Sequence, residues 1–381
     1  AAGKPAATSP AAPATPKPSA PTVAQPSGAS ASAAPAPTPP ANWQAQWDQW
    51  VTGAKQEGKL AVIIPPGDFY RTILDAFQKK YGISTEAMVG NGNADVLPKI
   101  GAERKAGQFN WDVVMHSPGS QFAGLEKIGA QDPLKPAIIL PEILDDSKWF
   151  RGFEYGWADK AKTHVYSFIA FASPTARINR SIVPVSALSK VDQLWDPQWK
   201  GKIAMQDPRI PSSGVQTATC WMLAKGEDKL RQFFQTQQPV LTQDRRQLGD
   251  WMVRGTYPIG VAAAPDTLGA FIAQHVDVSQ IKPLSLDPPD GAYYTGGTGS
   301  LGLINKAPHP NGAKVFANWL LTAEGQTVYS KAVNSDSRRT DVPVVDQASL
   351  PDPKKDYMML DVEETYPLRD KAVAIAKEIL K

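Results

Sequence analysis

Strand-like apolar runs alternate with segments of helical periodicity along most of this 381-residue chain. Short apolar runs predict buried strands, and apolar residues that recur every three or four positions predict helices. The first strands are predicted at 60–64, 84–89 and 112–116, and the first helices after Asp68, at 94–106 and at 120–128. This alternation is typical of an α/β fold in which helices cover both faces of a mostly parallel sheet.

The alternation pauses at a long apolar segment, residues 164–171, and then begins again. Further strands are predicted at 202–205, 257–264 and 281–286, and residues 293–304 are expected to return to the first group of elements. We therefore predict two α/β lobes joined by extended crossovers. The predicted boundaries are 42–165 for the first part of lobe one, 166–290 for lobe two, and 291–381 for the second part of lobe one with the C-terminal helices, the last of which lies on the outside at 366–380.

The first 40 residues consist almost entirely of Ala, Pro, Ser, Thr and Gly. Such a segment cannot bury enough apolar surface to offset the entropy of ordering, and its prolines favour extended conformations. We therefore predict a disordered linker at 1–41. Trp43, Trp47 and Trp50 follow on one face of a predicted helix, a spacing that favours packing on the core over stacking on a sugar.

Composition and charge narrow the functional classes. The chain is 42% hydrophobic, enough for one large core or two medium ones, and its net charge of +3 is small beside 40 basic and 37 acidic side chains. No basic run is interleaved with aromatic residues, so nucleic-acid binding is not expected. No apolar run approaches the roughly 20 residues of a membrane-spanning helix. The first residues contain neither a charged n-region nor an apolar h-region, so we expect a chain that has lost its leader.

Residues 299–326 combine a strand (GSLGLIN), a loop (APHPNGAK) and a helix (VFANWLLTAEGQ). Four apolar residues share one face of that helix: Val315, Phe316, Trp319 and Leu320. This segment and the later SRRTDVP at 337–343 resemble the C-terminal part of the bacterial extracellular solute-binding proteins of ABC importers, of the family 1 or ferric-binding type. The resemblance covers about residues 43–345.

This resemblance implies a two-lobed, type II periplasmic-binding-protein fold that closes on a small solute and presents it to membrane permease subunits. It also implies a monomer in the periplasm or at the cell surface, anchored by a lipidated cysteine ahead of Ala1, with plain secretory cleavage as the alternative. Crossovers near 168–171 and 296–299 are expected to carry the hinge whose equilibrium the ligand biases. The alternative role is that of a ligand-sensing partner of a membrane receptor, which would use the same cleft.

Cleft residues are expected in the loops at the carboxyl ends of the strands, where open α/β sheets bind their ligands. The predicted ligand-binding residues are Asp68, Phe69, Tyr70, Asn91, Asn93, His116 and Ser117 in lobe one, Asp207, Arg209, Ser212, Ser213, Pro265, Asp266 and Thr267 in lobe two, and Tyr294 with Thr295 on the return crossover. Two serines that open a helix near Arg209 suit an anion site, although helix capping explains them equally well. We expect a small polar or anionic organic solute, and we expect Arg209→Ala and Tyr294→Ala to weaken its binding first.

Ferric iron is the alternative ligand. Iron-carrying members of the resembling family use adjacent tyrosines in the lobe-two loop that follows the strand equivalent to residues 257–261, and here that loop, 262–267, contains no tyrosine. Tyr293 and Tyr294 form a pair, but on the expected return crossover. Because neighbouring residues of a strand point to opposite faces, at most one of them is expected to face the cleft.

The sequence contains no enzyme motif in the structural context that the motif requires. HExxH, a phosphate-loop lysine and a GxSxG elbow are missing, and the GxGxxG match at 297–302 continues as a strand instead of opening a helix. Cys220 lies in an apolar helical run, where we expect core packing and not the cofactor-bearing loop thiol of porphyrin-synthesis deaminases, which share a two-lobed scaffold. We predict no enzyme, no cofactor and no metal. Arg338 and Arg339 are expected in a charged surface turn, with contact to a ligand carboxylate or phosphate as the alternative.

Overall fold

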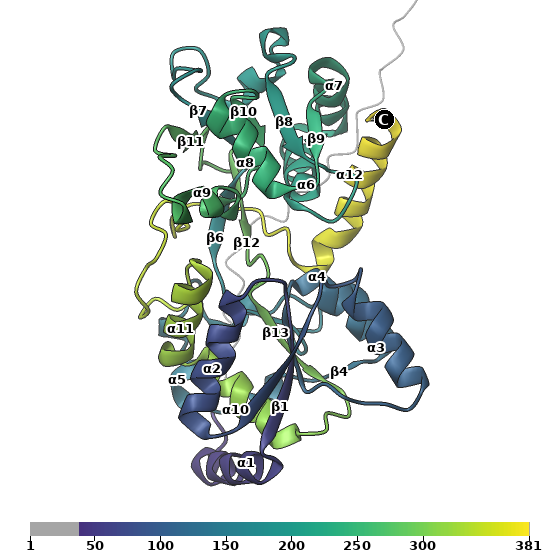
Figure 1. The fold of residues 1–381 in the computed structure, drawn as a ribbon, viewed down its shortest axis with the longest axis vertical. Coiled ribbons are helices and arrows are strands. Elements are labelled where there is room, and N and C mark those ends of the chain that lie inside the picture. The colour runs from purple at the N-terminus through teal and green to yellow at the C-terminus, as the bar shows by residue number, and fades with distance from the viewer. Residues whose placement is uncertain (1–37, 381) are drawn as a thin grey trace, which may run out of the picture. The chain divides into compact units, whose positions relative to one another are not determined.

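The computed structural model describes residues 38–380, apart from the side chains of Pro265, Asp266, Ala270 and Ala273. The predicted linker therefore lies almost wholly outside the described residues. Strands and helices alternate along the described chain, as the sequence predicts (Figure 1). Within the described residues, no helix has the length and apolar character that a membrane span requires.

The first sheet has the order β2-β1-β3-β13-β4, with β5 paired to β13. β1 runs parallel to β2 and β3, whereas β13, which comes from much later in the chain, is antiparallel to β3. Its strands are β1 (Lys59–Ile64), β2 (Ser84–Val89), β3 (Val113–His116), β4 (Gln131–Asp132), β5 (Tyr166–Ser167) and β13 (Ser300–Ile304), and the helices around it are α1 (Trp43–Glu57), α2 (Phe69–Tyr81), α3 (Val96–Lys105), α10 (Pro310–Leu321) and α11 (Ala323–Val333).

Both faces of this sheet are buried. Along β1, Leu60, Val62 and Ile64 pack in one core with Phe77 of α2 and with α10, because alternate strand residues share a face. The intervening residues of β1 belong to a separate core beneath α3. Burial on both faces explains why β1 is an almost continuous apolar run.

The second sheet has the order β11-β7-β10-β8-β9. β8 runs parallel to β9 and β10, and β7 is antiparallel to β10 and β11. Its strands are β7 (Ala176–Asn179), β8 (Ile203–Gln206), β9 (Val240–Thr242), β10 (Ile259–Val261) and β11 (Ile281–Pro283), and its helices are α6 (Ser213–Lys225), α7 (Glu227–Gln237), α8 (Arg245–Arg254) and α9 (Gly269–Ala273). Trp195, Trp221 and Phe233 form the aromatic centre of its core.

Two antiparallel strands connect the sheets. β6 (Phe171–Pro174) leads from β5 into β7, and β12 (Ala292–Thr295) pairs with β6 just before the chain re-enters the first sheet at β13. Both crossovers predicted from the sequence are therefore extended segments that lie side by side. The hinge and the lobe boundaries remain predictions.

The C-terminal segment crosses between the sheets once more. α12 (Tyr366–Ile379) packs against α6 and α7, and its apolar residues Ala372, Ile375 and Ala376 belong to the core of the second sheet. The sequence places this helix on the outside and groups it with lobe one. Instead, its buried face completes lobe two, and Figure 1 shows α12 running alongside α6.

Candidate functional site

The carboxyl ends of β1, β2 and β3 meet at one edge of the first sheet, because these strands are parallel. Asp68 and Phe69 follow β1 and are exposed, Phe69 to 42%. Tyr70 is buried, and its hydroxyl lies 2.6 Å from Thr298 Oγ1 in the segment before β13. Asp68 and Phe69 are therefore available to a ligand, whereas Tyr70 ties α2 to the return strand.

The loops after β2 and β3 lie against each other. A Cβ on Gly92 would lie 3.0 Å from His116 Cε1 and 2.2 Å from Ser120 Oγ, so the 90–93 loop covers the end of β3 directly. Asn91 donates from its backbone and its side chain to Asp95, while Asn93 is exposed. The structure thus brings together the predicted lobe-one residues after β2 and β3.

His116 is a neutral link between these two loops. The backbone N–H of Ser117 donates to Nδ1 of His116 at 2.8 Å, so Nδ1 carries no proton and Nε2 donates to the Gly90 carbonyl at 3.1 Å. His116 is 7% exposed, and burial lowers the pKa of its imidazole because it disfavours the charged form. His116 therefore positions the loops and holds no charge for a ligand.

Acidification should weaken the fold through His116. The unfolded histidine keeps a pKa of about 6.5, so below that pH the unfolded state takes up a proton that the buried ring resists, and stability falls. We expect the urea midpoint to drop between pH 7 and pH 5, and to drop less in His116→Asn. Equal slopes in both proteins, followed by tryptophan fluorescence, would contradict this assignment.

In lobe two, Arg209 is engaged by its own neighbour. Its Nη2 and Nε donate to the Asp207 carboxylate at 2.9 and 3.0 Å, and its Nη1 donates to the Leu380 carbonyl at 3.2 Å. Asp207 is 2% exposed. Although burial alone would raise the pKa of Asp207, the hydrogen bonds from Arg209 hold it below its ordinary value. The predicted cation is therefore neutralised within the chain.

The two serines at the start of α6 also find partners within the chain. Ser212 accepts from Gly214 N at 3.1 Å as the helix cap, and its hydroxyl donates to the Asp207 carbonyl at 2.6 Å. Ser213 donates to the Ala262 carbonyl at 2.7 Å. Of the two interpretations of these serines, capping is the one that the geometry supports, and the start of α6 offers a ligand few free donors.

The loop after β10 contains three further predicted residues. Its backbone forms a 3-10 turn, Pro265–Leu268, and the side chains of Pro265 and Asp266 lie outside the described residues. Thr267 is 2% exposed and its backbone N–H donates to the Ala264 carbonyl at 3.0 Å. Thr267 thus faces the interior in this structure.

The tyrosine pair on β12 points to two different cores. Tyr293 packs with Cys220 and Leu360, and its hydroxyl donates to Gln216 Oε1 at 3.4 Å. Tyr294 packs on the other face, stacked on Phe150 with ring centroids 5.8 Å apart. Burial raises the pKa of Tyr294 to about 12, against the opposing effect of a nearby guanidinium, and it raises the pKa of Tyr293 as well. Both phenols are therefore buried and protonated.

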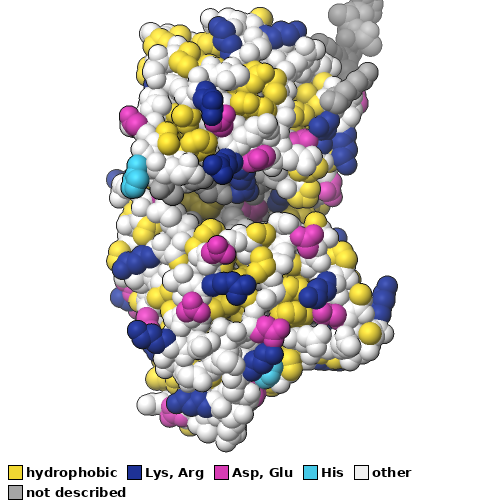
Figure 2. Space-filling view, viewed as in Figure 1, with side chains coloured by type: hydrophobic (Ala, Val, Ile, Leu, Met, Phe, Trp, Pro, Cys, Tyr) yellow, Lys and Arg dark blue, Asp and Glu magenta, His cyan; other side chains and the backbone are white. Residues whose placement is uncertain are grey.

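The surface is hollowed between the two groups of elements, and Figure 2 shows basic and acidic side chains on both margins of the hollow. Within the described residues, no group of three or more His, Cys, Asp and Glu side chains is placed to hold a metal ion. The candidate site is therefore a mixed polar margin formed by strand-end loops.

Residues 59–332 match the family model of the bacterial extracellular solute-binding proteins. The chain belongs to this family. Its members are transport proteins, so the expectation of the solute-binding component of an ABC transporter, and of no enzyme, is confirmed. Homologous proteins of this kind act in the periplasm or outside the cell.

Solved structures share the fold of this solute-binding protein. Iron-bound HitA from Pseudomonas aeruginosa matches with a TM-score of 0.63 at 16% identity, over 84% of this chain and 99% of that one. Trichodesmium IdiA (FutA), in complex with iron and citrate, matches with a TM-score of 0.62 at 17% identity, over 85% and 100%. An ABC transporter structure from Clostridium perfringens has a TM-score of 0.64 at 16% identity, over 84% and 100%. These likenesses confirm the two-lobed α/β fold.

An uncharacterized protein of Haemophilus influenzae is similar in sequence. It is 23% identical to this solute-binding protein over 312 residues, which cover 79% of this chain and 84% of that protein.

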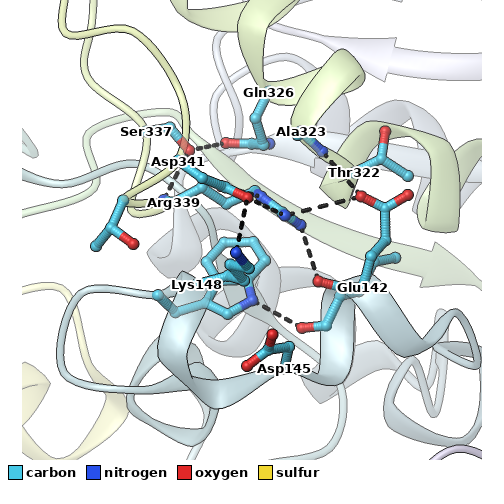
Figure 3. A network of polar contacts seen from close by, with 12 residues as sticks. Glu142, Asp145, Lys148, Thr322, Ala323, Gln326, Ser337, Arg339 and Asp341 are labelled. Atoms are coloured by element: carbon cyan, nitrogen blue, oxygen red, sulfur yellow. Dashed lines mark hydrogen bonds and ion pairs between the residues drawn. The ribbon is translucent and has the colours of Figure 1, made fainter.

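Arg338 and Arg339 do not form a surface turn, and that expectation is wrong. They are 1% and 3% exposed. Arg339 donates to both oxygens of Asp341 at 2.9 Å and to the carbonyls of Leu321 and Glu142, so it joins the end of α10 to α5 (Pro141–Leu144), as Figure 3 shows. Charge-assisted hydrogen bonds of this kind are among the strong ones, so the buried guanidinium ties these segments together.

Two other expectations concern apolar packing. Trp50 is 7% exposed, and Trp43 and Trp47 pack partly buried on the same core, so the tryptophan stripe of α1 is a core face. Cys220 is fully buried, and burial raises the pKa of its thiol, as befits an unreactive core residue.

Three residues next to the crossovers, Asp361, Gln216 and Arg369, were not among the predicted ligand-binding residues. Asp361 accepts from Gln216 Nε2 at 2.5 Å and is hydrogen-bonded to Thr295 Oγ1. Arg369 Nη1 lies 3.4 Å from Asp361 Oδ1. Asp361 and Arg369 lie in the tail after the family match ends at residue 332, where no motif marks them. Their approach to Thr295 depends on the path of the tail across the molecule.

Proposed function

We propose that this protein captures a small polar or anionic organic solute between its two lobes and delivers it to the permease subunits of an ABC importer. The observation that carries the proposal is the pair of crossover strands, β6 and β12, which join two sheets at the side where the parallel strands end. Family membership supports it. A lipid anchor on the periplasmic or cell-surface side is part of the proposal.

Closure of the lobes is the proposed working step. A solute that contacts both lobes when they are closed, and one lobe when they are open, stabilises the closed form by the difference in binding free energy. The permease then distinguishes loaded from empty protein by the arrangement of the lobes. A sensing role at a membrane receptor would use the same change.

The described groups favour a polar organic solute. Asp68, Phe69 and Asn93 are exposed at the lobe-one margin and offer a carboxylate, a ring and an amide. In lobe two, the charge of Arg209 is balanced by Asp207. A solute held by hydrogen bonds and ring contacts suits this combination, because specificity in small-molecule sites comes from a few placed polar groups.

Ferric iron remains a second candidate, because two structures with the same fold, HitA and Trichodesmium IdiA (FutA), were determined with iron. Phenolate oxygens are hard ligands, but burial raises the pKa of both tyrosines of β12 and so makes their phenolates costly. A ferric site would therefore need tyrosine side chains that the described structure keeps inside two cores.

Native mass spectrometry on protein exported by its own cells tests the proposal. We expect the native mass to exceed the denatured mass by one organic molecule, without a visible absorption band. A metal-sized increment with a tyrosinate band would overturn the organic solute in favour of iron. Identical masses in repeated preparations, together with no melting-temperature shift across a panel of polar metabolites, would contradict solute capture itself.

A further inference from the structure

The tail of the chain runs along the crossover strands. Tyr294 N donates to the Met358 carbonyl at 2.9 Å, and Leu360 N donates to the Tyr294 carbonyl at 3.5 Å, so residues 358–360 lie beside β12 in parallel bridging. Earlier in the tail, the backbone N–H of Ala172 in β6 donates to the Ser349 carbonyl at 2.7 Å. The tail therefore lies against both connecting strands.

The end of the tail is held firmly by lobe two. Ala372, Ile375, Ala376 and Leu380 are buried in the aromatic core of the second sheet. Ion pairs join Lys371 to Glu227 and Arg231 to Glu378 at its surface. Because apolar burial contributes about 25 cal/mol per Å², this helix should stay with lobe two in any movement of the lobes.

The start of α12 touches lobe one at the predicted ligand loops. Tyr366 packs edge-on against Phe122, with ring centroids 4.6 Å apart, and a Cβ on Gly119 would lie 1.3 Å from its hydroxyl oxygen. Gly119 follows the His116–Ser117 loop at the end of β3. Just before the helix, Glu363 N donates to the Ala158 carbonyl at 2.9 Å, and Glu363 Oε2 accepts from Lys160 N at 2.8 Å.

Between these two ends, Asp361 joins the tail to the crossover and to lobe two. Its carboxylate is bonded to Thr295 of β12 and to Gln216 of α6, as described above. A cavity of about 10 Å³ beneath it, lined in part by Ser167, Tyr294 and Asp361, has room for about one water molecule. The tail is therefore packed closely onto the crossovers.

We propose that residues 358–366 form a latch across the two crossovers, in which Tyr366 and Glu363 hold lobe one while α12 stays anchored in lobe two. The lobe-one contacts are the packing of Tyr366 on the small cluster of Phe122, Ala158 and Val165 and two hydrogen bonds of Glu363, whereas the lobe-two contacts belong to a large apolar core. The lobe-one contacts are the weaker of the two and therefore break first when the lobes separate. The latch thus holds the lobes together without a solute, and it rests on the proposed movement of the lobes.

The test uses the solute-free protein, so its result is independent of which solute the protein binds. Spin labels placed at exposed Lys105 of α3 and exposed Lys200 of lobe two report the distance between the lobes, and the fully buried Cys220 stays unlabelled. We expect Tyr366→Ala to shift the distance distribution to longer values and to broaden it. Asp370→Ala, at an exposed position of the same helix, is the matched control and should leave the distribution unchanged.

Gly119→Ala tests the latch from the other lobe. Its backbone is not in the left-handed region and so accepts alanine, but the new methyl group would overlap the Tyr366 hydroxyl oxygen, at 1.3 Å, and must displace that side chain. We expect Gly119→Ala to reproduce the shift expected for Tyr366→Ala, with far-ultraviolet circular dichroism unchanged. Distributions identical to the unmodified protein in Gly119→Ala and in the Tyr366→Ala, Glu363→Ala double variant would overturn the latch. A latch that fails this test would leave the mass-spectrometric test of solute capture unaffected.

Discussion

Arg338→Met should lower the free energy of unfolding by about 4 kcal/mol, because it leaves the buried carbonyl of Ser167 and two partly buried carbonyls without this donor. Arg338 is 1% exposed, and its Nη2 donates to the carbonyls of Phe150 and Gly152 at 2.8 Å each. Its guanidinium also lies over the rings of Tyr155 and Tyr166, at 5.5 and 5.8 Å from their centroids. Methionine fills much of the space but restores none of these bonds.

Urea denaturation followed by tryptophan fluorescence measures this change, provided that the dependence on urea stays the same. Arg254→Met is the matched control, because the Arg254 side chain is 74% exposed and its pair with Asp250 lies at the surface of α8. The control should lose less than about 0.5 kcal/mol. A similar loss in both variants would show that Arg338 is no more important than a surface arginine.

Arg209→Ala should cost about 3 kcal/mol at pH 7, because it leaves the buried carboxylate of Asp207 without its charged partner. The Asp207 side chain is 3% exposed and receives two guanidinium hydrogen bonds. The sequence-based expectation was that this variant would first lose its ligand. We now expect any weaker binding to follow from the lost stability and the displaced loop.

The stability lost in Arg209→Ala should depend on pH. Since Arg209 holds the pKa of Asp207 below its ordinary value, the pair contributes stability above the unfolded pKa of about 3.9, and this contribution disappears as the pH falls through the lower folded pKa. The difference between the two proteins should therefore be largest at neutral pH and shrink below about pH 4. Adding Asp207→Asn to Arg209→Ala should recover part of the loss at pH 7, and equal stability at pH 7 would contradict the structural role.

Much of the fold could be predicted from local patterns. The apolar run of β1 and the helical spacing of α10 each place their elements correctly, because a strand or helix buried in a core must repeat its apolar residues at the period of its own geometry. The GxGxxG match at 297–302 was rejected because its last residues have the apolar pattern of a strand, and these residues do belong to β13. Crossovers and lobes follow from the order of these elements.

The candidate site was harder to predict, because a polar residue carries no periodic signal for its partner. Arg209 and Ser212 were placed correctly at the end of β8 and the start of α6, yet their hydrogen-bonding groups turn inward to Asp207 and the helix backbone. The spacing of Asp207 and Arg209, two residues apart, allowed such a pair but did not require it.

The order and character of the strands and helices were thus determined by the sequence itself, since each depends on neighbours a few residues away. Tertiary structure alone decided that Arg338 and Arg339 are buried, that Tyr293 and Tyr294 belong to separate cores, and that the tail brings Asp361 to Thr295. Those contacts join segments far apart in the chain, and their free energy depends on burial and on partners that exist only after the two sheets have formed.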